Sequence, residues 1–177
     1  MIIGLVGEIA SGKGTSAKYL IEKYGASSHR FSTSLRDVLN RLHIPVEREN
    51  MQELSKILRE KFGQDLLAKV ISEDARKDPS PLKVIDGIRR FEDIKYLKEL
   101  PEFKLVYISA DMQTRYDRLI KRGENEDDAN KTLEQFKKDH EAETELEITK
   151  VGETAHIKID NNGDLENLHK QLDKIIN

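Results

Sequence analysis

The stretch IIGLVGEIASGKGT (residues 2–15) decides the fold expected of this chain. An apolar run is followed at once by a loop with the spacing G-x-x-x-x-G-K, whose defining residues are Gly7, Gly12 and Lys13. Glycines let a backbone curl closely around a phosphate, because they lack a Cβ atom and tolerate positive φ angles. Successive N–H groups and the following helix N-terminus favour an anion, and the lysine adds a full positive charge. The stretch therefore predicts a buried strand, a phosphate-binding loop and a helix, in that order.

One position departs from the commonest form of such a loop. The residue after the lysine is usually Ser or Thr, whose hydroxyl binds Mg²⁺, whereas this chain has Gly14. Thr15 follows and could hydrogen-bond a phosphate, but a direct contact between Thr15 and a metal ion is left open. The residues predicted to bind the nucleotide are Gly7, Ala10, Ser11, Gly12, Lys13, Gly14, Thr15 and Ser16.

Further strands are expected outside this stretch. Short continuous apolar runs occupy residues 82–86, 103–109 and 156–160, and residues 29–32 form a weaker candidate. Continuous rather than alternating apolar residues are typical of parallel strands that are buried on both faces. The chain is thus expected to contain a parallel sheet covered by helices.

Helical patterns alternate with these strands. Apolar residues at helical spacing mark residues 51–62, 91–100 and 165–175. Residues 122–147 form one long polar stretch, which predicts a solvent-exposed helix or a flap over a site. Alternating strands and helices indicate βαβ units with right-handed crossovers.

The composition narrows the class of protein. The chain has 177 residues, 37% hydrophobic and 36% charged, with a net charge of -3 and no cysteine. This length suits one domain, and the absence of cysteine excludes disulfides and thiolate metal sites. Positive and negative residues are interspersed along the chain, so the sequence has no basic region of the kind that binds DNA or RNA. We find no signal peptide and no apolar run long enough for a membrane span, so we expect a cytoplasmic protein without a membrane partner.

An acidic residue ends the strand predicted at 82–86. In VIDGIRR (84–90), apolar residues lead directly into Asp86. A carboxylate at the C-terminal end of a parallel strand faces the crevice where phosphates bind. Asp86 is therefore predicted to hold a water molecule on Mg²⁺.

Two of these segments resemble a known family. The residues GKGT (12–15) resemble the loop of the adenylate kinase and nucleoside monophosphate kinase group. The segment DGIRR (86–90) is similar to the DGFPR segment of those kinases, with Arg89 in place of the proline. The resemblance implies that Arg90 contacts the acceptor phosphate, and that Mg²⁺ is held mostly through water and phosphate oxygens.

Two weaker resemblances concern arginines. STSLRDVL (32–39) resembles the ST-G-D-x-L-R segment of adenylate kinases without its Gly-Asp, which implies that Arg36 binds the acceptor phosphate. TRYDRLIKRGENEDD (114–128) resembles the lid-entry segment of UMP/CMP-type kinases. Its residues Arg118 and Arg122 are four apart and share a helical face, where they could clamp the transferring phosphoryl group.

The resemblance implies one α/β domain over residues 1–177, with the three-layer P-loop kinase fold. Its five-stranded parallel sheet is expected in the order 2-3-1-4-5. Residues 33–80 are predicted to form a helical acceptor-binding insertion, and residues 115–147 a short lid with its following helix. We expect a monomer or a homodimer.

The activity expected from these residues is ATP-dependent phosphoryl transfer, with ATP and Mg²⁺ as cofactors and a small-molecule acceptor. Lys13, Arg90, Arg118 and Arg122 would supply the catalytic charge, and Arg36 and Arg90 would bind the acceptor. The favoured acceptor is a nucleoside or deoxynucleoside monophosphate.

Other acceptors and another class of protein stay open. Residues 52–71 look more like dephospho-CoA kinase-related proteins, and a hydroxyl acceptor requires a carboxylate that takes its proton. Those kinases place it near the end of the second strand, where this chain has residues 32–34, Ser-Thr-Ser, although Glu8 is an alternative base. A kinase-fold binding protein with slow ATPase activity is also possible. A GTPase is disfavoured, because Asn130-Lys131 does not continue as N-K-x-D.

Overall fold

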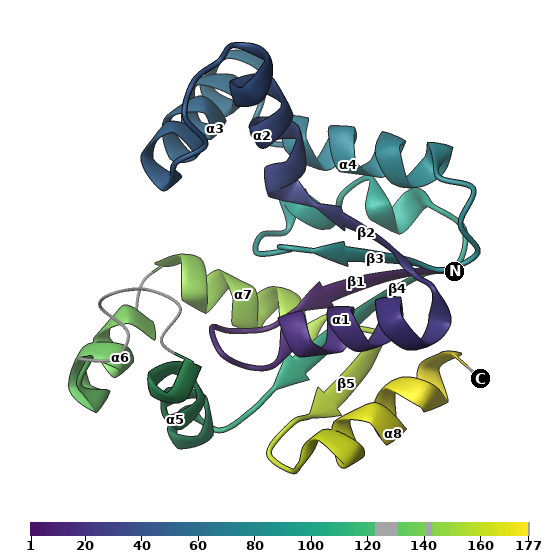
Figure 1. Cartoon of the computed structure of the whole chain (residues 1–177), viewed down its shortest axis with the longest axis vertical. Helices are drawn as coiled ribbons and strands as arrows, with labels where there is room; N and C mark the ends of the chain where they lie inside the picture. Colours follow the sequence, from purple (N-terminus) through teal and green to yellow (C-terminus); the bar gives the residue numbers. More distant parts are fainter. Residues whose placement is uncertain (123–130, 141–142, 177) are drawn as a thin grey trace.

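A five-stranded parallel sheet organises the chain in the computed structural model, which describes residues 1–122, 131–140 and 143–176. Its strands lie in the order β2-β3-β1-β4-β5, and all neighbouring pairs are parallel (Figure 1). Both the strand order and the strand direction predicted from the sequence are confirmed. The strands are β1 (Ile2–Val6), β2 (Ser27–Arg30), β3 (Lys83–Asp86), β4 (Phe103–Ser109) and β5 (Ile157–Asp160).

The register places the loop after β1 and Asp86 at the end of β3 at the same edge of the sheet. Strand β1 is central and pairs with both β3 and β4. Arg30 at the end of β2 aligns with Asp86 at the end of β3. Because all strands run the same way, these ends and the loop after Val6 lie at the carboxyl edge, where α/β sheets bind ligands.

Helices cover both faces of the sheet and make the expected three layers. Helices α1 (Lys13–Tyr24) and α8 (Leu165–Ile176) cover one face, where Leu20 and Leu172 are fully buried. Helices α4 (Leu66–Lys77) and α7 (Glu143–Glu153) cover the other. The inner strands β1, β3 and β4 therefore bury side chains on both sides, which explains their apolar sequences, whereas the edge strands β2 and β5 are partly exposed.

Helices α2 (Phe31–Arg41) and α3 (Arg48–Phe62) project beyond these layers (Figure 1). Leu35 and Leu39 anchor α2, but α3 has no buried residue. The apolar stripe predicted at 51–62 does form a helix, yet Phe62 is 65% exposed. This pair of helices is attached to the molecule by few core contacts.

Two elements predicted from the sequence, a strand at 29–32 and a helix at 91–100, differ in the structure. The weak strand candidate at 29–32 is shifted, because α2 already begins at Phe31. The helix predicted at 91–100 is instead two short 3₁₀ turns, η1 (Glu92–Ile94) and η2 (Leu97–Glu99). The buried residues Ile94, Leu97 and Leu100 recur every three positions, and this spacing suits the three residues per turn of a 3₁₀ helix.

The polar stretch at 122–147 was predicted as one helix or a flap, but the structure has separate helices over it. Helix α5 (Met112–Arg122) precedes it, and α6 (Leu133–His140) lies inside it as a separate helix. Phe136 on α6 is only 1% exposed and its ring packs against Tyr116, so α6 is not a fully solvated helix. Residues 123–130 of the predicted lid lie outside the described residues. No helix among the residues described is long and apolar enough to cross a membrane.

Candidate functional site

The loop between β1 and α1 has the backbone that phosphate binding requires. Gly12 has a φ of 110° and Ala10 a φ of 59°, so the chain turns back on itself before the helix. A Cβ atom at Gly7 would clash with the backbone oxygen of Ile108. No side chain caps the N-terminus of α1, and its first turn has no acidic residue. Its backbone N–H groups are therefore available to an anionic ligand.

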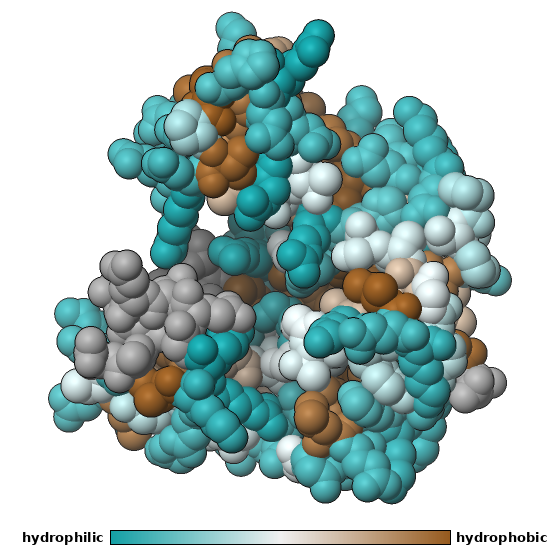
Figure 2. All heavy atoms as spheres, in the orientation of Figure 1, coloured by the Kyte–Doolittle hydropathy of each residue, from teal (hydrophilic) through white to brown (hydrophobic). Residues whose placement is uncertain are grey.

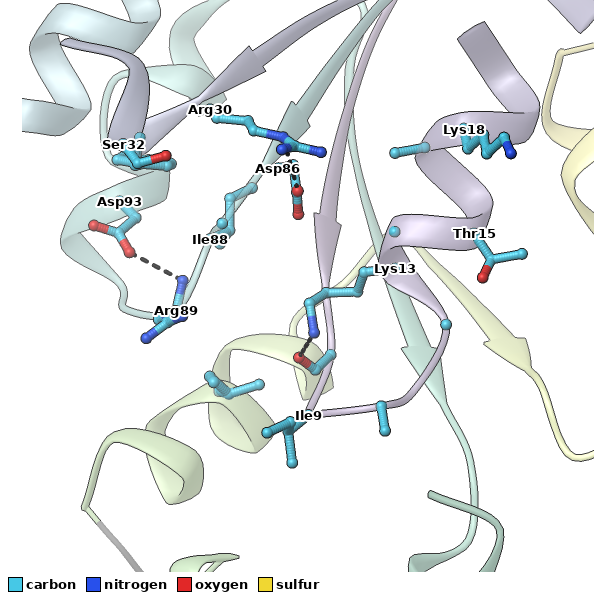
Figure 3. A pocket seen from close by; sticks show the side chains of 18 of the residues that line it. Ile9, Lys13, Thr15, Lys18, Arg30, Ser32, Asp86, Ile88, Arg89 and Asp93 are labelled. Atoms are coloured by element: carbon cyan, nitrogen blue, oxygen red, sulfur yellow. Dashed lines mark hydrogen bonds and ion pairs between the residues drawn. The ribbon is translucent and has the colours of Figure 1, made fainter. Parts of the chain in front are cut away.

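Lys13 lies across this loop. Its Nζ atom donates hydrogen bonds to the carbonyl oxygens of Gly7 at 2.6 Å and Glu8 at 2.9 Å (Figure 3). This places a positive charge inside the curl, where the phosphates of a nucleotide would lie. The loop thus fits a nucleoside triphosphate on backbone geometry, helix polarity and charge.

Oxygen donors for Mg²⁺ are also available at the phosphate end of the loop. Thr15 is exposed at the start of α1, and Asp86 ends β3 in the same cleft. A Cβ atom at Gly14 would meet no atom within 4 Å, so local packing does not require a glycine there. These residues fit an ion held mainly by phosphate and water, with one carboxylate near it.

Two buried side chains support the loop from behind, and the sequence did not reveal either of them. Asn161, directly after β5, is 5% exposed and donates from Nδ2 to the Ser11 carbonyl at 2.8 Å. Arg115 on α5 is 3% exposed and donates to the carbonyls of Ala110 at 3.0 Å and Ile9 at 3.5 Å. In the sequence, Arg115 cannot be distinguished from the arginines predicted to face the phosphates.

Glu8 is turned away from the ligand side of the loop. One of its carboxylate oxygens accepts a hydrogen bond from the Tyr107 hydroxyl at 2.9 Å, beneath the loop. Burial, and then this hydrogen bond, raises the pKa of Tyr107. Glu8 is not among the residues that line the cleft, so this geometry does not support Glu8 as a base for the acceptor.

A large cleft runs from the loop to helices α2 and α3. Its volume is about 2240 Å³, well above the roughly 300–1,000 Å³ typical of a pocket for one small ligand. Figure 2 shows the molecule hollowed beneath the projecting lobe. The volume suits two ligands side by side.

The lining of this cleft is strongly basic. Eleven Lys or Arg side chains line it, against four acidic side chains, although the whole chain carries a net charge of -3. The tertiary structure therefore concentrates positive charge where an anionic ligand can reach it. The basic residues are Lys13, Lys18, Arg30, Arg48, Lys56, Arg59, Arg89, Arg90, Arg118, Arg122 and Lys131.

Most of the residues predicted from the sequence meet in this cleft. Its lining includes Asp86, Arg90, Arg118 and Arg122, together with Gly7, Ala10, Gly12, Lys13, Gly14 and Thr15 of the loop. One Nη atom of Arg118 donates to the Gly163 carbonyl at 3.4 Å, and the other is buried without a hydrogen-bond partner in the described structure.

Three predicted residues lie elsewhere. Arg36 is exposed on α2 and is not part of the cleft lining. Ser11 and Ser16 are both fully buried, and the Ser16 hydroxyl donates to the Gly12 carbonyl at 3.0 Å. Ser16 thus stabilises the first turn of α1 from inside, whereas the Ser11 hydroxyl is buried without a hydrogen-bond partner in the described structure.

Asp86 has a basic neighbour on the adjacent strand. Its Oδ2 atom lies 3.4 Å from Nε of Arg30, which extends over it from the adjacent strand (Figure 3). The sequence did not single out Arg30. The pairing follows from the alignment of β2 with β3, which the sequence does not specify.

Asp93 organises a second group of arginines. Its Oδ2 atom accepts the backbone N–H groups of Arg89 at 2.9 Å and Arg90 at 3.0 Å. Its Oδ1 atom lies 3.9 Å from a guanidinium nitrogen of Arg59, whose side chain is 13% exposed. Desolvation, and then the charge of Arg90, lowers the pKa of Arg59. Two guanidinium groups thus lie within electrostatic reach of each other, and an anion between them would relieve their repulsion.

Comparisons with known proteins agree with this geometry. The model of a family described as an AAA domain matches residues 6–137. The UPF0200 protein of Pyrococcus furiosus is 30% identical over 181 residues, which cover 99% of this chain and 96% of that protein. The UPF0200 protein of Sulfurisphaera tokodaii is 29% identical over 175 residues, which cover 99% and 95%.

Solved structures share the fold at low sequence identity. TT1252 from Thermus thermophilus has a TM-score of 0.63 and 17% identity, covering 99% of this chain and 96% of its own. Shikimate kinase from Aquifex aeolicus has a TM-score of 0.60 and 16% identity, with the same coverage. These structures establish a P-loop kinase fold, and at such identities they establish nothing about the substrate.

Proposed function

This chain belongs to the AAA-domain family and to the UPF0200 proteins, and from that premise we propose that it transfers the γ-phosphoryl group of ATP to a small acceptor that already carries a phosphate. A nucleoside or deoxynucleoside monophosphate is the favoured acceptor. The observation that carries this proposal is the excess of basic over acidic side chains along the cleft, eleven against four.

The two ends of the cleft suit the two reactants. ATP would lie on the loop, with its phosphates against the N-terminus of α1 and Lys13. The acceptor phosphate would lie near Arg90 and Arg59, whose guanidinium groups bind phosphate oxygens in pairs. An acceptor phosphate oxygen then forms a bond to the γ-phosphorus, and the bond from that phosphorus to the β–γ bridging oxygen breaks to leave ADP.

Catalysis in such a site consists of positioning and charge neutralisation. Lys13, Arg118 and Arg122 would contact phosphate oxygens around the transferred group. Asp86 and Thr15 would hold Mg²⁺ through water, and the ion would supply further charge neutralisation when bound. Closure of the region that includes residues 115–147 would exclude water and so limit hydrolysis of ATP.

The acceptor is proposed to be a phosphate because a free base is absent from the described part of the cleft. A hydroxyl acceptor needs a carboxylate that can take its proton. Of the four carboxylates that line the cleft, Asp86 is next to Arg30, Asp93 binds two backbone N–H groups, Glu22 lies 3.7 Å from Lys18, and Asp164 accepts the backbone N–H of Asn167. Glu8 faces Tyr107 beneath the loop. A phosphate oxygen is already negative and needs no such base.

A coupled assay of ADP formation tests the proposal. Nucleoside monophosphates, deoxynucleoside monophosphates, nucleosides and dephospho-CoA are offered with ATP and Mg²⁺, and inorganic phosphate is measured in parallel. We expect rapid ADP formation with at least one monophosphate and little phosphate release without an acceptor. ADP formation only with nucleosides or dephospho-CoA would show a hydroxyl kinase. Slow phosphate release that no acceptor changes would show a nucleotide-dependent binding protein.

A further inference from the structure

Asp86 lies between an arginine and the phosphate-binding loop at the carboxyl edge of the sheet. The strand order β2-β3-β1 places Arg30, at the end of β2, on one side of Asp86 and the loop after β1 on the other. Arg30, Asp86 and most of the loop line the same cleft. The carboxylate can therefore be approached from two sides, by Arg30 and by a cation on the phosphates of a nucleotide.

Arg30 and Mg²⁺ would compete for this carboxylate. Nε of Arg30 lies 3.4 Å from Oδ2 of Asp86, and Figure 3 shows the guanidinium group turned toward the carboxylate. Mg²⁺ near Asp86, held directly or through water, would draw on the same negative charge, and two cations close to one carboxylate repel each other. In the free protein, Arg30 thus already neutralises part of the charge that the ion needs.

The contact between Arg30 and Asp86 is easily broken. The side chain of Arg30 is 59% exposed and that of Asp86 is 20% exposed, and ion pairs of this kind contribute little to stability. Arg90, which follows Asp86 by four residues, lines the same cleft. A phosphate bound beside Arg90 would offer Arg30 several charged oxygens, which a guanidinium group binds in pairs. Such a phosphate is a stronger partner for Arg30 than one carboxylate oxygen at 3.4 Å.

We propose that Arg30 couples the metal ion to the acceptor. Without an acceptor, Arg30 pairs with Asp86 and weakens the binding of Mg²⁺. A phosphate of the acceptor draws Arg30 away and leaves Asp86 to the ion. The inference rests on the proposed function, from which it takes the positions of Mg²⁺ and of the acceptor phosphate. Arg30 is thus a positioning residue that acts through Asp86, and it limits ATP hydrolysis until both reactants are bound.

The first measurement needs no acceptor. Calorimetry gives the dissociation constant of a non-hydrolysable ATP analogue without and with Mg²⁺, and the ratio of the two constants is the magnesium enhancement. Arg30→Gln should raise this enhancement about two- to fivefold over that of the parent chain, which is the range that an exposed ion pair supplies. Arg30→Lys keeps the positive charge and should raise it less.

Two controls assign the effect to the contact between Arg30 and Asp86. Asp86→Asn removes the carboxylate, so adding Arg30→Gln to that variant should leave the magnesium enhancement nearly unchanged. Arg76→Gln removes an arginine of matched exposure, 58%, which lies 3.6 Å from Glu73 and does not line the cleft. It should bind the analogue as the parent chain does.

The second measurement tests the link to the acceptor, with inorganic phosphate as the probe. The analogue saturates the loop, so that phosphate does not bind there. Phosphate should bind more tightly with Mg²⁺ than without it, because coupling between two ligands is reciprocal. In Arg30→Gln, this gain in phosphate affinity should be about two- to fivefold smaller.

Three outcomes would overturn the inference. These are an unchanged magnesium enhancement in Arg30→Gln, an equal rise when Asp86 is already replaced, and a phosphate affinity on which Mg²⁺ has no effect that depends on Arg30. The proposed function fails separately. If no monophosphate supports ADP formation in the coupled assay while Arg30→Gln still raises the enhancement, the kinase activity is rejected and the competition for Asp86 remains.

Discussion

The phosphate-binding loop and helix α3 face each other across one cleft, yet they are built in opposite ways. The loop rests on a packed support, in which Ser11 and Ser16 are fully buried and Asn161 is 5% exposed. Helix α3 has no buried residue and presents charged side chains to the same cleft. Core packing therefore holds the loop, the proposed donor side, in one geometry, while charge on a weakly anchored helix marks the proposed acceptor side. A substitution on α3 can change ligand preference with little effect on the free energy of unfolding. A substitution in the residues that support the loop is expected to change both ligand binding and the free energy of unfolding.

Replacing Lys13 with Ala tests the donor side most severely. Transfer should fall by about 100-fold or more, because a charge that faces the developing phosphoryl charge is lost. The free energy of unfolding should change by no more than about 1 kcal/mol, since the lysine donates only to two part-buried carbonyls. Steady-state kinetics and urea denaturation measure the two effects.

Lys69→Ala, at an exposed position on α4 outside the cleft lining, is the control and should behave as the parent chain. Undiminished transfer by Lys13→Ala would remove the loop from the mechanism.

Replacing Arg59 with Gln tests the acceptor side. We expect the KM for the acceptor to rise by about 10- to 100-fold, because one guanidinium of the Arg59–Arg90 pair is lost. ATP affinity should stay within about twofold, since Arg59 lies on α3 and not at the loop. Arg59→Lys keeps the charge without the paired donors, and should restore binding only in part.

Lys61→Gln on the same helix lies outside the cleft lining and serves as the matched control. If Arg59→Gln weakens ATP binding and leaves the acceptor KM unchanged, the division into two sides is wrong.

Replacing Asn161 with Ala should affect stability and ligand binding together, unlike the changes on α3. The Ser11 carbonyl would lose its 2.8 Å hydrogen bond in a buried setting, which costs about 1–3 kcal/mol. Chemical denaturation should show this loss, and titration with an ATP analogue should show weaker binding. Asn40→Ala, at an exposed position on α2, should change neither. Full stability in Asn161→Ala would mean that this amide does not support the loop.

Replacing Gly14 with Ala should give the smallest effect. A methyl group there meets no atom within 4 Å, and alanine is favoured over glycine in a helix by about 0.5–1 kcal/mol. We expect the free protein to become slightly more stable and ATP to bind more weakly, because the Cβ atom would lie where a phosphate approaches the backbone. A less stable free protein would show that Gly14 serves folding and not the ligand.

The fold was largely predictable because its signals are local. The continuous apolar runs at 2–6 and 103–109 match β1 and β4 residue for residue. The loop motif identified the neighbouring strand and helix by itself. The apolar spacing at 91–100 predicts an α-helix, but buried side chains three residues apart also suit the two 3₁₀ turns that form there.

The sequence grouped the residues of the loop more completely than the residues on the opposite side of the cleft. The loop residues come from one continuous stretch, so spacing alone groups them. Arg30, Arg59 and Asp93 come from three separate elements, and nothing in their local sequence separates them from surface residues such as Arg36. Their roles depend on strand register and on the rotation of a helix.

The sequence by itself determined the parallel sheet, the phosphate-binding loop and the lysine that serves it, because each depends on residues close together in the chain. The tertiary structure alone decided which arginines face the cleft, which way Glu8 points, and that Asn161 and Arg115 support the loop. It also sorted the charges, so that a chain of net charge -3 lines its cleft with eleven basic side chains. The physical reason is that the potential in a cleft depends on which charges the fold brings together in space, and composition does not record that arrangement.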